Sequence, residues 1–402
     1  MNDSPGPGPS RQSPRQVIQS PRAALEPEAA PPAPPASRHA RNQWVVIGNL
    51  IMSLLLVGLV GTFLATVYAR QAFVAPGPLP QDRAVFIPRG SGIEQIAETL
   101  ERNGVIANRL LFIGAVHVLG RSNDLKWGEY LFPRAVSTAE ALAIIIEGKP
   151  IEYRLTIPEG LTSEQIVGRL RDNDVLTGEI ARIPREGSLL PETYRFTRGT
   201  TRQQMIDQMT QHQTRLLQQI WSRRAPDLPL RSPEELVILA SIVEKETGKA
   251  EERSRVAGVF INRLNRRMRL QSDPTIVYGI VGGRGTLGRP ISRADINQLT
   301  PFNTYQIDGL PPTPIANPGR AAMEAVANPA RHRDLYFVAD GTGGHVFAET
   351  LEQHNRNVAQ WREIERQRAN PEAARDRSSA DILPPAPAAP AARTSTPGRA
   401  TR

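Results

Sequence analysis

Cysteine is absent from this chain of 402 residues, so disulfide bonds and thiolate metal sites are excluded. The six histidines offer no substitute for such a site. None of them follows the HExxH spacing of a zinc site, and His345 and His354 stand nine residues apart. We therefore expect neither a metal nor another cofactor.

Lysine is scarce as well. The chain has 49 basic and 40 acidic residues, a formal charge of +9, yet only four of the basic residues are lysines: Lys126, Lys149, Lys245 and Lys249. The arginines are scattered, and aromatic residues make up only 5% of the chain. A groove for a nucleic-acid strand needs basic residues interleaved with aromatic rings, and no run has that pattern. We expect no nucleic-acid partner.

Large apolar residues are nearly missing from both ends of the chain. Residues 1–43 are rich in proline, serine, alanine and arginine, and residues 369–402 in proline, alanine and arginine. Such segments bury too little apolar surface to offset the entropy cost of folding. We expect a disordered cytoplasmic segment over 1–43 and a disordered tail over 369–402.

One segment, in contrast, carries no charge at all: the 25 mostly apolar residues from Trp44 to Tyr68. This is long enough to span a bilayer as a helix, and rings at its two ends suit the membrane interfaces. A cleavable signal peptide would be shorter and closer to the start of the chain. We expect an uncleaved transmembrane helix over 44–68, followed by a short stiff linker over 69–83.

The flanks of this segment predict its orientation, because positive charges gather on the cytoplasmic side of a membrane helix. After the segment, Arg70 is the only basic residue before Arg83. We expect a single-pass protein of the inner membrane, with a cytoplasmic N-terminus and the remainder in the periplasm. Five arginines precede the segment: Arg11, Arg15, Arg22, Arg38 and Arg41.

An internal repeat follows, in which residues 85–106 align without gaps on 155–176 at an offset of 70. Each copy has the pattern of a strand, a Pro/Gly turn and an amphipathic helix. We expect a first module over 84–150, completed by a strand at 128–133 and a helix at 137–147, and a second repeat over 151–183. Nine pairs are identical: Ile87/Ile157, Pro88/Pro158, Gly90/Gly160, Glu94/Glu164, Gln95/Gln165, Ile96/Ile166, Leu100/Leu170, Asn103/Asn173 and Val105/Val175.

The asparagine pair of the repeat, Asn103 and Asn173, falls where a helix can end in a left-handed residue. Residues 184–368 then have a mainly helical pattern. A hairpin over 335–340 and 345–347, with a Gly-rich turn, interrupts that pattern before a last helix. The sequence therefore predicts an α+β protein with small αβ modules and a mainly helical domain over 184–368.

One helix of that domain, expected from Pro233 to about Thr247 with Gly248 as its stop, contains an apolar run that ends abruptly on a carboxylate. Ser232 and Glu235 form a capping box, and an apolar run over 236–243 indicates burial on all sides. Glu244 follows at the edge of this core. Because burial favours the neutral carboxyl and raises its pKa, Glu244 is a candidate for the acid that a glycosidase needs. The alternative is a helix-end glutamate paired with an arginine such as Arg253 or Arg255.

Two loops beyond this helix combine polar side chains and rings on Pro-containing backbones. Stiff loops of mixed donors and rings suit a carbohydrate, which needs hydrogen bonds and a stacking face. The alternative is a set of ordinary surface turns. The candidates for substrate binding are Gln271, Asp273, Thr275 and Tyr278 in the first loop, and Asn303 and Tyr305 in the second.

Several motifs in this order resemble the YceG-like family of membrane-anchored endolytic murein transglycosylases. The resemblance covers about 84–368, and Thr313 departs from it, since the family often has glycine after the two prolines. The motifs are ASIVEKET (240–247), VFINRLNRRMRLQSDPTIVYG (259–279), SRADI (292–296), FNTY (302–305), GLPP (309–312), ANPG (316–319) and LYFVADGTGGHVF (335–347), with EGSLLPETYRF (186–196) before them.

The resemblance implies that Glu244 is the catalytic residue and that the module over 84–150 is LysM-like. It implies cleavage between N-acetylmuramic acid and N-acetylglucosamine inside a peptidoglycan strand, leaving 1,6-anhydro ends, with peptidoglycan synthases as partners in the membrane. Two alternatives stay open. One is a hydrolytic muramidase with Asp273 as second carboxylate, and the other is a membrane-anchored scaffold that binds glycan without cleaving it.

Overall fold

The computed structural model describes residues 43–369. The segments predicted to be disordered, 1–43 and 369–402, lie outside the described residues except for Gln43 and Ala369. The chain divides after Ala72 into two units, and each is described by itself.

The first unit contains α1, Gln43–Val74, whose residues after Ala72 belong to the second unit. No residue of α1 is buried, and by length and composition it is one helix able to cross a membrane. It continues six residues beyond the predicted end at Tyr68, because polar residues after the span do not stop a helix. It ends two residues before Pro76, where the proline disfavours helical backbone in the residue that precedes it.

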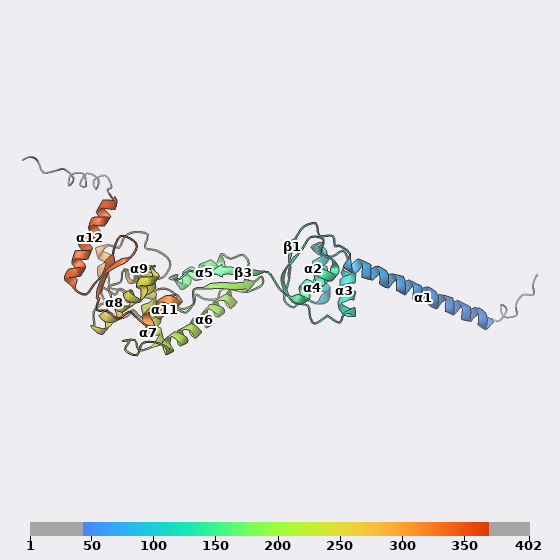
Figure 1. Ribbon diagram of the computed structural model, residues 1–402, viewed down its shortest axis with the longest axis horizontal. Helices are drawn as coiled ribbons and strands as arrows, with labels where there is room; N and C mark the ends of the chain where they lie inside the picture. The colour runs from blue at the N-terminus through green and yellow to red at the C-terminus, as the bar shows by residue number, and fades with distance from the viewer. Residues whose placement is uncertain (1–42, 370–402) are drawn as a thin grey trace, which may run out of the picture. The chain divides into compact units, whose positions relative to one another are not determined.

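The second unit begins with a small αβ module (Figure 1). Strand β1 pairs antiparallel with β2, with Val85 opposite Tyr130. Helices α2 and α4 cover them with buried Ile96, Leu100 and Ile145. Sequence reasoning missed α3, which the side chain of the preceding residue, Asn108, caps. The elements are β1 Arg83–Ile87, α2 Ile93–Arg102, α3 Arg109–Val118, β2 Gly128–Phe132 and α4 Thr138–Glu147.

Part of the predicted linker packs on this module. Leu79 is buried in the module's core, and its carbonyl accepts a hydrogen bond from the Ala135 amide at 2.9 Å. Asp82 accepts another from the amide of Arg134 at 2.8 Å. Residues 79–82 therefore belong to the module's packed structure, which periodicity alone did not indicate.

The second repeat forms strand β3, Glu152–Thr156, and helix α5, Ser163–Arg171. Strand β3 pairs antiparallel with β4, Thr193–Thr197. Their shared core also contains residues from the start of α6, Arg202–Ser222, such as Met205 and Met209. The predicted border at 183/184 therefore runs through this core.

The repeat recurs in local structure. Gln95 and Gln165 each accept a hydrogen bond from the amide three residues earlier, at 3.1 and 3.0 Å, which caps α2 and α5. The left-handed ends predicted for Asn103 and Asn173 are wrong. Asn103 has φ −85°, and the next residue, Gly104, takes the left-handed backbone at φ 71°. The side chain of Asn173 instead accepts hydrogen bonds from two following amides.

The remaining elements form a mainly helical part with one hairpin, as predicted (Figure 1). Helix α7 packs against α8 and α11 around the buried residues Leu239, Phe260 and Met323. In the hairpin, β5 pairs antiparallel with β6. The elements are α7 Pro233–Glu246, η3 Ala250–Glu252, α8 Arg253–Asn265, α9 Asp273–Val281, α10 Arg293–Asn297, α11 Arg320–Ala327, β5 Tyr336–Ala339, β6 His345–Ala348 and α12 Leu351–Ala369.

Gly187 joins the second repeat to this helical part, and its replacement should be costly. Its φ is 76°, and an added Cβ would lie 2.6 Å from Pro314 Cγ and 2.8 Å from Val237 Cγ1. We predict that Gly187→Ala lowers the free energy of unfolding by about 2–4 kcal/mol, from left-handed strain and overpacking together. Urea denaturation measures this change.

Gly178 is the matched control, because it has nearly the same φ, 75°, but its nearest contact would be ordinary, Thr201 Cβ at 3.7 Å. Gly178→Ala should cost only about 1–2 kcal/mol, from strain alone. Equal losses in the two variants would show that Gly187 is not a packing contact.

Candidate active site

Helix α7 carries Glu244 in its last turn. The side chain of Ser232 accepts a hydrogen bond from the Glu235 amide at 3.3 Å and so caps the helix. The predicted capping box is only half formed, because the Glu235 carboxylate accepts from the amide of Arg231 instead. Residues 236–243 are all buried, so α7 lies rigidly in the core and holds Glu244 at its edge.

The carboxylate of Glu244 lies between two helix starts. Oε2 accepts a hydrogen bond from the Gly319 amide at 2.8 Å, just before α11. Oε1 lies 3.8 Å from Nη2 of Arg253, at the start of α8, and only 6% of the Glu244 side chain is exposed. Arg253 is thus the neighbour that the alternative interpretation named, whereas Arg255 pairs with Asp334 at 2.8 Å.

A turn of the second repeat closes over this carboxyl group. The position of a Cβ on Gly160 is 3.5 Å from Glu244 Cγ, and Lys245 Nζ donates to the Gly160 carbonyl at 3.3 Å. Burial raises the pKa of Glu244. The Gly319 hydrogen bond and the cations of Arg253 and Lys245 oppose that rise in pKa, while the charge of Glu159 adds to it.

Asn317 fixes the loop that delivers the Gly319 amide. Its fully buried side chain donates to Ser163 Oγ at 3.1 Å and to Glu186 Oε1 at 2.9 Å, and accepts from the Leu189 amide at 3.0 Å. Three segments that are distant in the sequence therefore meet at one amide group.

Glu186 is a second buried carboxyl group, which sequence reasoning did not single out. It accepts from the amide of Ser163 at 2.7 Å and from the hydroxyl of Tyr278 at 3.2 Å. Burial raises its pKa against these hydrogen bonds. Its place in the EGSLLPETYRF motif was the available signal, but its partners lie 23 to 131 residues away.

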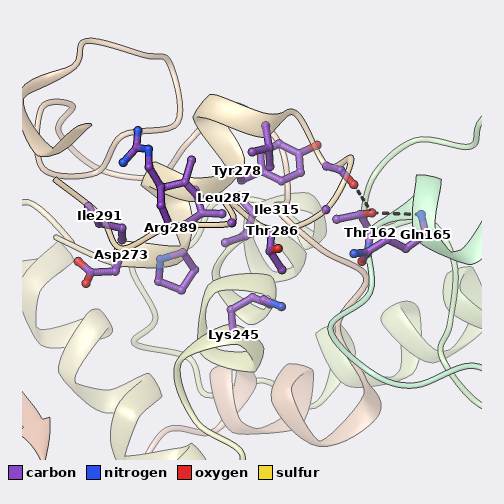
Figure 2. A pocket seen from close by; sticks show the side chains of 16 residues that line it. Thr162, Gln165, Lys245, Asp273, Tyr278, Thr286, Leu287, Arg289, Ile291 and Ile315 are labelled. Carbon is purple, nitrogen blue, oxygen red and sulfur yellow. Dashed lines mark hydrogen bonds between the residues drawn. The ribbon is translucent and has the colours of Figure 1, made fainter. Parts of the chain in front are cut away.

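A cavity of about 410 Å³ lies beside Lys245, the residue after Glu244. Figure 2 shows Lys245 reaching into it from below, with Thr162 and Gln165 on one side and Tyr278 above. Glu244 itself is not among its lining residues. These are Thr162, Gln165, Lys245, Asp273, Pro274, Val277, Tyr278, Val281, Gly283, Gly285, Thr286, Leu287, Gly288, Arg289, Ile291 and Ile315.

The structure separates the six predicted binding residues into two groups. Asp273 and Tyr278 line the cavity, and Tyr305 donates to Asp273 Oδ1 at 2.7 Å. Thr275 and Asn303 are buried, 0% and 1% exposed.

The polar side-chain atoms of Thr275 and Asn303 already form hydrogen bonds within the protein. Thr275 bonds the Ser272 carbonyl, and the amide nitrogen of Asn303 donates to three backbone carbonyls. Gln271 is exposed but accepts from Arg263 at 3.2 Å. Thr275 joins the two loops through Thr304 Oγ1 at 2.9 Å, whereas Gln271 ties the first loop to α8 and Asn303 ties the second loop to α10.

Glu246, two residues after Glu244, is a third buried carboxyl group that sequence reasoning did not propose. It accepts a hydrogen bond of 2.5 Å from Ser272 Oγ. Burial raises its pKa to about 7. Its helical position, about 200° from Glu244, turns it toward the loop of Asp273. The available signal in the sequence was the second glutamate of the run Glu244-Lys245-Glu246.

Within residues 43–369 these features define a mixed α+β protein, with one helix able to cross a membrane and a cavity of mixed polar and apolar lining beside buried carboxyl groups. The chain belongs to the YceG-like family, whose sequence profile matches residues 85–360. A crystal structure of a yceG-like protein from Listeria monocytogenes is 32% identical in sequence, with a TM-score of 0.44. The match covers 69% of this chain and 98% of that one.

Two relatives bear the name endolytic murein transglycosylase. The one from Streptococcus pneumoniae serotype 2 (strain D39) is 34% identical over 325 residues, which are 69% of this chain and 58% of the relative. The one from Bacillus subtilis (strain 168) is 29% identical over 302 residues, 67% of this chain and 82% of the relative. The chain thus spans just over half the length of the streptococcal relative.

The high pKa of Glu246 predicts a pH-dependent stability. The folded protein keeps a proton up to about pH 7, whereas the unfolded chain loses it near the ordinary value of 4.5. This contribution to stability is complete below pH 4.5 and is lost as pH rises through 7. We predict that Glu246→Gln, permanently neutral, gains about 2–3 kcal/mol relative to the native chain between these two pH values.

Urea denaturation at about pH 4.5 and about pH 8 measures this gain. Glu251→Gln is the matched control, since it replaces an exposed glutamate nearby by the same amide. A constant difference for Glu246→Gln would contradict the raised pKa.

Proposed function

We propose that the chain is an endolytic peptidoglycan lytic transglycosylase that cleaves between N-acetylmuramic acid and N-acetylglucosamine within a glycan strand. The observation that carries this proposal is the carboxyl group of Glu244, buried, rigidly held and raised in pKa. A carboxyl group that keeps its proton can protonate a leaving glycosidic oxygen. The family and the names of the relatives support the substrate and the reaction.

In the proposed reaction Glu244 acts first as acid and then as base. Its proton moves to the glycosidic oxygen as the bond from that oxygen to C1 of the muramic acid breaks. The C6 hydroxyl of the same sugar forms a new bond to C1, which closes the 1,6-anhydro ring. The proton of that hydroxyl returns to the Glu244 carboxylate. No water is consumed, and attack within one sugar has a high effective molarity.

The cavity beside Lys245 is the proposed place for sugar units next to the cleaved bond. Asp273 and Tyr305, joined by a hydrogen bond of 2.7 Å, would orient hydroxyl or acetamido groups. The ring of Tyr278 would offer a stacking face. We assign Gln271, Thr275 and Asn303 to the support of these loops, because their polar side-chain atoms already have protein partners.

The remaining sequence predictions complete the proposal. The segment 84–150 would be a LysM-like glycan-binding module, supported by the β–α–α–β order of its first four elements, which α4 follows. Residues 151–183 would be a connecting repeat and 184–368 the catalytic domain.

Helix α1 would anchor the chain in the inner membrane, with the N-terminus in the cytoplasm and the rest of the chain in the periplasm, near peptidoglycan synthases. Protease added outside spheroplasts should then degrade the part after α1, and protection of that part would contradict this orientation.

We predict that Glu244→Gln reduces glycan cleavage by roughly 10²–10⁴-fold while the chain stays folded, because the amide cannot donate a proton in the same way. The full chain in detergent is incubated with purified peptidoglycan, and products are identified by mass spectrometry. The native chain should release products with 1,6-anhydro ends.

Asp273→Asn tests the alternative mechanism in the same assay. A muramidase with Asp273 as second carboxylate would release reducing ends, which contain one more water, and would lose activity in this variant. Full activity of Glu244→Gln, or reducing-end products from the native chain, would contradict the proposed function.

A further inference from the structure

Gly319 is flanked by two carboxylates. Its amide donates to Glu244 Oε2 at 2.8 Å, and the carboxylate of Glu159 occupies the space where a Cβ on residue 319 would lie. The backbone at Gly319, φ −75° and ψ 171°, is open to any residue. A side chain at residue 319 is therefore compatible with the backbone, but it would push the Glu159 carboxylate out of its present place.

Glu159 stands on the turn between β3 and α5, and the turn is held firmly. Gly160, with φ 74°, donates its amide to the Asn317 carbonyl at 3.1 Å, and the amide of Asn317 donates to the Leu161 carbonyl at 2.9 Å. Glu159 itself is exposed, and its carboxylate has no hydrogen bond with any residue between 43 and 369. The backbone of the turn thus places an unpaired negative charge next to Gly319, on the other side of which lies the buried Glu244.

The other groups that face Glu244 are two cations and one amide donor. Arg253 approaches from α8, Lys245 from α7 itself, and the amide of Gly319 from the start of α11. All three stabilise the ionised form of Glu244, which cannot donate a proton. The charge of Glu159 opposes them and, after burial, contributes to the raised pKa of Glu244.

We propose that Glu159 is a positioning residue of the active site, which keeps Glu244 in its acid form against the surrounding positive charges. This inference rests on the proposed function. The same negative charge makes the Glu244 carboxylate a better base when it takes the proton of the C6 hydroxyl. The turn of the second repeat thereby becomes part of the machinery that cleaves glycan, through its effect on Glu244.

The pH profile of kcat/KM tests this inference, measured as release of 1,6-anhydro products between about pH 5 and pH 8.5. With Glu159→Gln, the loss of activity on the alkaline side should begin at lower pH, while the rate on the acid side is retained. The loss at neutral pH should be less than about tenfold, because an exposed charge is screened by solvent and salt. Glu179→Gln, an exposed glutamate of the same repeat, should leave the profile unchanged.

Gly319→Ala moves the Glu159 carboxylate without removing its charge. In Gly319→Ala the new Cβ displaces the Glu159 carboxylate, so the alkaline side should shift in the same direction. Glu159→Ala leaves room for that Cβ. The double variant should therefore shift the profile no further than Glu159→Ala alone, a non-additivity expected only of residues in contact.

Two results would overturn the inference while leaving the proposed function intact. One is an unchanged profile in Glu159→Gln, and the other is an equal fall in its rate at every pH, as a structural role would produce. In both cases Glu244→Gln would still be inactive. Activity of Glu244→Gln would instead remove the proposed function itself.

Discussion

The hydrogen bond from the Gly319 amide to Glu244 is the contact on which the site depends. It joins the end of α7, whose residues 236–243 are all buried, to the start of α11, and it positions one oxygen of a carboxyl group that has almost no contact with water. Burying a carboxylate without partners costs several kcal/mol. One amide at 2.8 Å and one arginine at 3.8 Å offset only part of that cost, so burial still raises the pKa of Glu244 above its ordinary value.

The loop that supplies this amide needs support of its own. Asn317 provides it by bonding the second repeat through Ser163 and the 186–189 segment through Glu186 and Leu189. The second repeat is therefore built into the site, whereas the sequence pattern suggested only a connector. Its turn covers Glu244, and its Thr162 and Gln165 line the neighbouring cavity. In this protein the second repeat and the helical part meet at one candidate site.

The local structure of this chain was largely predictable, because capping residues and apolar periodicity act over a few residues. Ser232 and the run over 236–243 predicted α7 to within about one residue, and the repeat predicted β3 and α5. Local rules failed where two neighbouring residues can both take the left-handed backbone: at Asn103 the following glycine, Gly104, takes it instead. The contacts of Glu159, Glu186 and Glu246 join segments far apart in the chain, and spacing contains no information about them.

The central claim is that Glu244 holds its proton more tightly than an ordinary glutamate. Carbon-13 NMR of chain labelled at glutamate carboxyl groups measures this directly, with the Glu244 signal assigned by its absence from Glu244→Gln. The account predicts a pKa above the ordinary value of 4.5. A pKa at or below that value would mean that Arg253 and the Gly319 amide dominate, and that Glu244 is a structural ion rather than an acid.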